Sequence, residues 1–213
     1  GTRSRAFRGP NERWLAVAGG LVCIGAVALA SAGSSGDAAF GRGLLEALIV
    51  GVPIAVGLYA LRAPVNASFG IALLAIGFAW SLTALTESSL SVPYTIGRLA
   101  TWLTFPCVVY LLLAFPDGRI DKGLDRGLLV AGVVIMVVLF FGTAPLVQAF
   151  PPKTLWGTCT TDCPENAVFV LEAQPGLLTK VIYVREWLVE LLWLGLLYSM
   201  YRRWRAASPL QQR

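Results

Sequence analysis

The chain has 213 residues, of which 56% are hydrophobic and 14% are charged. Soluble domains carry about 25% charged residues, so this composition excludes an ordinary water-soluble domain and indicates a membrane protein. The formal net charge is +5, but the basic residues lie in short blocks between apolar segments, a pattern typical of membrane topology and not of a nucleic-acid surface. The sequence contains no histidine, which excludes histidine-ligated haem, histidine metal sites, histidine general-base catalysis and a phosphoacceptor histidine within these residues.

Six continuous apolar segments are long enough to cross a bilayer, for which about 20 residues are needed. We expect helices, because lipid offers no hydrogen-bond partner to an unpaired backbone group and because the segments lack the alternation of barrel strands. The predicted fold is therefore an all-α, polytopic bundle of six transmembrane helices, forming one domain over residues 14–201. The predicted spans are residues 14–32, 44–61, 67–85, 93–115, 127–146 and 177–201.

Lysine and arginine predict the orientation of the bundle. Basic blocks precede the first predicted span and follow the second, fourth and sixth, whereas the loops on the other side contain only Arg42 and Lys153. By the positive-inside rule, we predict a plasma-membrane protein with a cytoplasmic N-terminus (1–13) and a cytoplasmic exit segment (202–213). The blocks comprise Arg3, Arg5, Arg8, Arg13, Arg62, Arg119, Lys122, Arg126, Arg202, Arg203, Arg205 and Arg213.

The sequence FPDGRIDKGLDRG interrupts the apolar sequence abruptly after the fourth predicted span. Pro116 is expected to end the helix, Asp117 to occupy the turn, and Gly118 to permit a reversed backbone. Arg119 and the charges that follow it are expected to lie at the lipid headgroups. The segment is therefore predicted to be a tight cytoplasmic turn.

The longest predicted loop, residues 147–176, is expected on the outer side. Cys159 and Cys163 lie four residues apart in it, and an oxidising compartment favours a disulfide between them over two free thiols. Two cysteines without histidine do not suit a zinc site. Cys23 and Cys107 fall within predicted spans and are interpreted as packing residues.

Ionisable residues gather in the outer halves of the predicted spans. An ionised group at the bilayer centre costs about 3 kcal/mol or more, so neutralisation by pairing is expected. Two hypotheses remain open: a polar, outward-facing pocket that receives a ligand, ion or proton, or a structural ion-pair network that fixes helix register. The residues are Glu46, Glu87, Arg98, Lys180, Arg185, Glu186 and Glu190. Glu186 and Glu190 are four residues apart and share a helix face, with Arg98 as the candidate cation at their depth.

Two stretches resemble the N-terminal membrane sensor region of actinobacterial sensor histidine kinases. LLLAFPDGRIDKGLDRGLLVAG, residues 111–132, is similar to the turn between two of their spans, and YRRWRAASPLQQR, residues 201–213, is similar to the stretch before their kinase core. The resemblance implies a sensory input module that signals through its last helix to an attached kinase. It also implies a homodimer formed through that kinase, ATP and Mg²⁺ used there, and a response regulator as partner. No cofactor is expected in these residues themselves.

The sequence leaves one other function class open and disfavours another. A small membrane transporter, or a structural subunit of a membrane complex, is the alternative, and Pro53 and Pro106 are candidate positions for the broken helices that transporters use. An intramembrane enzyme is disfavoured because no catalytic constellation is present. The basic exit segment fits a signalling helix or a simple stop-transfer anchor equally well.

Overall fold

The computed structural model describes residues 10–33, 37–62, 67–115, 118–120, 123–150, 159, 163–171 and 175–206. The α-helices are α1 (Pro10–Ala32), α2 (Asp37–Leu61), α3 (Ala67–Ser81), α4 (Ser91–Ala114), α5 (Gly123–Ile135) and α6 (Pro175–Ala206). The 3-10 helix η2 (Leu82–Glu87) extends α3, while the π-helix η3 (Met136–Phe140) and the 3-10 helix η4 (Phe141–Leu146) extend α5. The described ranges contain helices and no strand, so the all-α prediction is confirmed.

Five helical segments are long and apolar enough to cross a membrane. They correspond to the first five predicted spans: Arg13–Ala32, Ala39–Leu61, Ala67–Glu87, Ser91–Ala114 and Gly123–Leu146. The last helix, α6, is not among them, because charged residues interrupt its apolar sequence. The fold is thus that of a multi-helix membrane protein. A sixth membrane crossing and the cytoplasmic position of both termini remain predictions.

All α-helices except α3 begin earlier than the apolar pattern suggested. Pro10 and Pro175 occupy the first positions of α1 and α6, where the missing N–H of proline costs no helix hydrogen bond. The second helix begins at Asp37, so Arg42 lies inside α2 and not in an outer loop as expected. Pro53 and Pro106 lie within the continuous helices α2 and α4, so neither proline breaks its helix.

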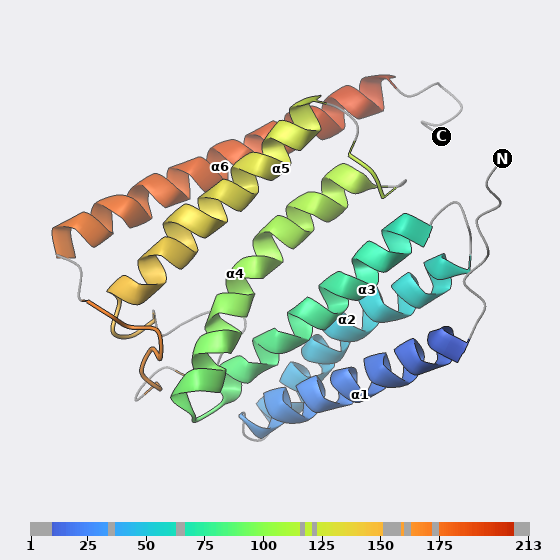
Figure 1. The fold of residues 1–213 in the computed structure, drawn as a ribbon, viewed down its shortest axis with the longest axis horizontal. Helices are drawn as coiled ribbons and strands as arrows, with labels where there is room; N and C mark the ends of the chain where they lie inside the picture. The colour runs from blue at the N-terminus through green and yellow to red at the C-terminus, as the bar shows by residue number, and fades with distance from the viewer. Residues whose placement is uncertain are drawn as a thin grey trace.

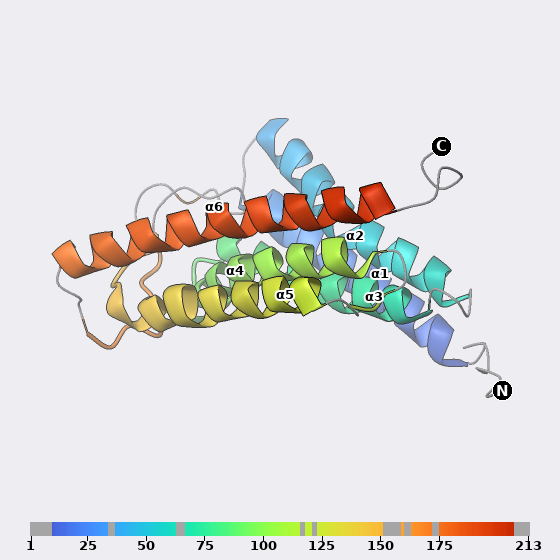
Figure 2. The same ribbon diagram turned by 90° about the horizontal axis from the view of Figure 1, so that it is seen from above.

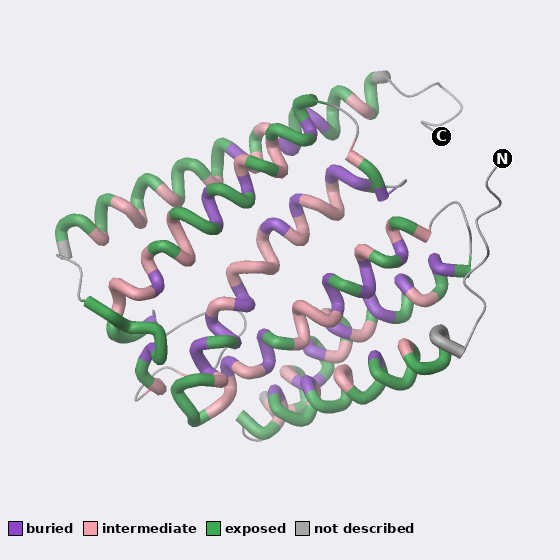
Figure 3. Tube along the Cα trace, viewed as in Figure 1, coloured by how far each residue is buried: buried purple, intermediate pink, exposed green. Residues whose placement is uncertain are grey.

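The bundle has two hydrophobic cores. The first joins α1, α2, α3 and η2 through residues such as Ala26, Val50 and Leu74. The second joins α4, α5 and α6 around Val109 and Leu196. Figures 1 and 2 show α1–α3 on one side, α5 and α6 on the other, and α4 between them. Burial is accordingly greatest along α3 and α4, while the outer faces of α1 and α6 are exposed (Figure 3). These exposed apolar faces are what lipid contact requires.

Glycine allows α2 and α3 to approach until their backbones touch. A Cβ atom on Gly57 would lie 2.8 Å from the carbonyl oxygen of Gly70, and one on Gly70 would lie 2.9 Å from that of Gly57. Backbone atoms cannot move aside as a flexible side chain can. This contact therefore needs glycine on both helices, as in other closely packed membrane helices.

The turn between α4 and α5 is described at residues 118–120, while Pro116 and Asp117 lie outside the described residues. Gly118 has φ +71°, a left-handed conformation that glycine adopts without strain, as the sequence predicted. Its N–H donates to the carbonyl oxygen of Ala114 at 2.7 Å, which caps α4. Tyr110 Oη donates to the carbonyl oxygen of Gly118 at 3.2 Å, and Arg119 is exposed.

The start of α1 and the end of α6 lie at the same end of the bundle (Figures 1 and 2). The exposed arginines Arg62, Arg119 and Arg126 belong to the end of α2, the α4–α5 turn and the start of α5. These segments all lie at that end too, which we call the basic end. The other end, which carries Cys159 and Cys163, is called the disulfide end.

Candidate functional site

An ion pair joins α2 to η2 near the disulfide end. Arg42 Nη2 donates to Glu87 Oε1 at 2.6 Å. The Glu87 side chain is only 4% exposed and that of Arg42 is 21% exposed, so little water screens the pair. The pair unites a predicted site residue with one that the sequence analysis had placed in a loop.

A second carboxylate, that of Glu46, lies one turn after Arg42 on α2 and is buried. Thr83 of η2 donates its hydroxyl to Glu46 Oε1 at 3.5 Å and also to the carbonyl oxygen of Trp80 at 2.7 Å. Residues four apart on a helix share a face, so Arg42 and Glu46 are directed to the same side of α2. The site therefore contains two carboxylates and one guanidinium, and has a net charge of −1 when both acids are ionised.

A cavity of ≈ 330 Å³ opens beside this group. Its walls are Gly33, Thr86, Glu87, Ser88, Ser89, Cys159 and Pro164. A Cβ atom on Gly33 would lie 2.3 Å from Glu87 Oε2, so only glycine lets the end of α1 approach this carboxylate. Hydroxyl groups and one carboxylate thus line a small polar opening at the disulfide end, which we call the polar cavity.

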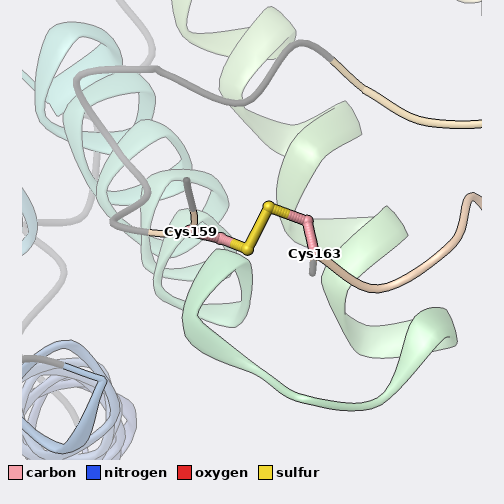
Figure 4. Close-up of a disulfide and its surroundings, with 2 residues drawn as sticks. All are labelled: Cys159 and Cys163. Carbon is pink, nitrogen blue, oxygen red and sulfur yellow. A yellow bond between two sulfur atoms is a disulfide. The ribbon is translucent and has the colours of Figure 1, made fainter. Parts of the chain in front are cut away.

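The disulfide between Cys159 and Cys163 closes one side of the polar cavity, with Cα atoms 5.6 Å apart. It lies beside the segment that joins η2 to α4 (Figure 4). The predicted pairing is therefore present, while Cys23 and Cys107 are free. Cys159 and Pro164 line the cavity together with Ser88 and Ser89, the residues that follow Glu87.

Residues after the disulfide are hydrogen-bonded to the ends of α4 and η4. Asn166 is buried, and its Nδ2 donates to the carbonyl oxygens of Ala144 and Val147 at 2.7 and 2.8 Å. The N–H of Ala167 donates to Thr95 Oγ1 of α4 at 2.9 Å. The segment that follows the disulfide is therefore attached to α4 and to the end of η4.

Arg98 is 4% exposed and lies on α4 among aromatic rings. Its guanidinium carbon is 5.9 Å from the ring centroid of Tyr94 and 5.4 Å from that of Phe150. Such contacts stabilise a desolvated cation by about 2 kcal/mol. The preceding Gly97 packs so tightly that a Cβ there would lie 2.3 Å from the backbone nitrogen of Thr86. Arg98 is thus one residue from the contact between α4 and the segment that carries Glu87.

The charged residues of α6 do not join this group. Lys180, Glu186 and Glu190 are exposed, and the guanidinium carbon of Arg185 lies 4.2 Å from the ring centroid of Phe140. Across the described part of the chain, no ion pair connects these four residues to Arg98, and the expected pairing of Arg98 with the α6 carboxylates is not formed. The structure brings together Glu46 and Glu87, with Arg98 nearby, and leaves the α6 group apart.

At the basic end, α6 is bonded to both of its neighbours. Arg203 donates to three carbonyl oxygens at the end of α4, those of Leu112, Leu113 and Phe115, at 2.9, 3.0 and 3.2 Å. One turn earlier, the buried hydroxyl of Ser199 donates to the buried carboxylate of Asp125 on α5. We call these contacts the exit clamp. A cation at a helix C-terminus also interacts favourably with the helix dipole.

Sequence reasoning missed Arg42, Thr83, Asp125, Ser199 and the bonds of Arg203. Only Arg42 had a local signal, since it lies four residues before Glu46 and the spacing fits one helix face. The Asp125–Ser199 contact joins positions 74 residues apart and has no local signature.

The polar cavity offers groups that bind small polar or charged molecules. Among the described residues, no cluster of three or more metal-ligating side chains is present. The walls of the polar cavity supply hydroxyls and the Glu87 carboxylate, which is paired with Arg42, and such groups can hold a small polar or charged molecule. Comparison with protein-family models, with curated proteins and with solved structures gave no match to this chain.

Proposed function

We propose that this chain is the membrane input module of a two-component sensor histidine kinase, in which a stimulus at the polar cavity is passed through α6 to a cytoplasmic kinase core. The observation that carries the proposal is the half-buried Arg42–Glu87 pair at the edge of an open polar cavity. Ionisable groups at membrane depth are costly and are found where a membrane protein binds or moves charge. The resemblance of the α4–α5 turn to sensor kinases is the reason for proposing a histidine kinase as the output domain.

One helix, α4, contacts α6 and also two segments that adjoin the polar cavity, η2 and the loop after the disulfide. At the disulfide end, Gly97 lies against the backbone of η2 and Thr95 accepts a hydrogen bond from the loop. At the basic end, the last carbonyl oxygens of α4 accept from Arg203 of α6. A ligand that binds one arrangement of η2 more tightly would shift α4, and through the exit clamp it would shift α6.

The competing interpretation is that the ion pair only fixes how η2 packs on α2. The exchange variant Arg42→Glu/Glu87→Arg separates the two, because it keeps an ion pair while reversing which helix carries which charge. If the pair is structural, the exchange variant should have both the stability and the kinase response of the unchanged protein. If the pair recognises a charged ligand, the exchange variant should have the stability of the unchanged protein but should not give its kinase response.

The direct test uses the whole reading frame that contains this chain, expressed in membrane vesicles. We expect this frame to encode a dimerisation helix with a histidine and an ATP-binding domain, and Glu87→Gln to change the rate of autophosphorylation with ATP and Mg²⁺. The matched control is Glu190→Gln, which removes an exposed carboxylate from α6 and should leave the rate unchanged. A reading frame without kinase domains, or equal rates for the two variants, would refute the proposal and favour the transporter or subunit alternative.

A further inference from the structure

An apolar groove opens on the side of the bundle, away from the polar cavity. It has a volume of ≈ 450 Å³ and lies between α3, α4 and α5. Its walls include Ala72 and Ala75 of α3, Pro106 and Cys107 of α4, and Val133 of α5. Small side chains on α3 create the space. We call it the lateral groove.

The lateral groove occupies the depth of one lipid leaflet. Its deepest residues, Ile76, Leu103 and Val133, lie about ten residues from the ends of their helices at the basic end, or about 15 Å at 1.5 Å per residue. Half of a hydrocarbon core of about 30 Å is the same length. The groove is open sideways, since Ile71 and Val133 in its walls are 59% and 39% exposed.

The mouth of the lateral groove at the basic end is polar. Ser68, near the start of α3, and Tyr110 lie in its walls. The turn at Gly118 packs against the backbone of Ser68 and Phe69, so the exposed Arg119 follows immediately after this contact. Arg62 and Arg126 are exposed at the same end. A hydrocarbon chain in the groove would thus place its polar group beside cations, which complements an anionic phosphate.

From these observations we propose that the lateral groove binds one acyl chain of an anionic phospholipid from the leaflet at the basic end. The proposal does not depend on the signalling function, since it rests on the shape, depth and charge of a different surface. The acyl chain would lie between α3, which contributes to the first core, and α5, which contributes to the second. The bound lipid would then fill the space where the two halves of the bundle are not in direct contact.

Photocrosslinking tests the proposal on the full chain in lipid nanodiscs. The probe is phosphatidylglycerol with a diazirine in the middle of one acyl chain, and crosslinked peptides are mapped by mass spectrometry. We expect crosslinks to concentrate on the walls of the groove in α3, α4 and α5. Unlabelled phosphatidylglycerol should displace the probe from these peptides, whereas unlabelled phosphatidylcholine should not.

Ala72→Phe fills the lateral groove and should abolish its crosslinks. Ala55→Phe is the matched control, because Ala55 is exposed on α2 at a similar distance from the basic end, and its crosslinks to the groove should remain. Crosslinks spread evenly over all exposed faces would overturn the proposal, as would a groove occupied by a second copy of the chain. Equal competition by the two unlabelled lipids would overturn the choice of an anionic headgroup. The competition experiment needs only the unchanged sequence, so it decides even if Ala72→Phe does not fold.

Discussion

Arg203→Gln should loosen α6 from α4 without disturbing the rest of the bundle. The arginine donates to three carbonyl oxygens at the end of α4, whereas glutamine is shorter, uncharged and has only two N–H donors. A hydrogen bond from a charged donor contributes about 1.5–3 kcal/mol, and the freed carbonyls can reach water at the exposed Phe115. We therefore expect a loss of about 2–4 kcal/mol for the whole contact. This loss raises the population in which α6 is detached by about 30- to 700-fold.

Hydrogen–deuterium exchange of the full chain in nanodiscs measures this population. Exchange should accelerate in peptides that cover the end of α4 and the end of α6, and it should stay unchanged in α1 and α2. Arg205→Gln is the control, since Arg205 donates to the exposed hydroxyl of Tyr201 on its own helix at 3.2 Å. Arg203→Lys, which keeps the charge but not the three-way geometry, should give an intermediate rate. If Arg203→Gln and Arg205→Gln exchange alike, the exit clamp does not hold α6.

Three further predictions test other contacts. Gly97→Ala should destabilise the bundle by about 1–3 kcal/mol or more in thermal unfolding, because its Cβ would meet the backbone of Thr86, whereas Gly25→Ala, in open space, should be neutral or stabilising. Ser199→Ala should lower stability by about 1–3 kcal/mol, because it leaves a buried carboxylate without this donor, whereas Ser89→Ala at an exposed position should have little effect. Alkylation of the unfolded chain without reductant should modify two of the 4 cysteines, and reduction should expose Cys159 and Cys163 as well.

Each of these predictions has a clear contrary outcome. Equal melting temperatures for the two glycine variants would show that α4 and η2 do not touch at their backbones. Equal stability of the two serine variants would show that the buried carboxylate finds its partner elsewhere. Four alkylated cysteines before reduction would show that the disulfide is absent from the protein.

Much of the helical architecture could be predicted from the sequence alone. Apolar length and the need to pair every backbone group in lipid predict the first five membrane-type helices and the all-α class. The tight turn was also predictable, since Gly118 adopts the left-handed conformation for which glycine is favoured. The disulfide followed from compartment and spacing. Each of these features depends on local composition, which a single segment carries by itself.

Only the tertiary structure decided which charges meet. The sequence grouped seven ionisable residues by depth, but depth does not determine the direction in which a helix turns each side chain. Packing of η2 against α2 paired Glu87 with Arg42, while α6 packed so that Glu186 and Glu190 face outwards. The exit clamp joins residues up to 91 positions apart, and Arg203 in it bonds backbone carbonyls, which carry no side-chain signature. Helix rotation and close packing are set by the shapes of all neighbours together, so no single segment encodes them.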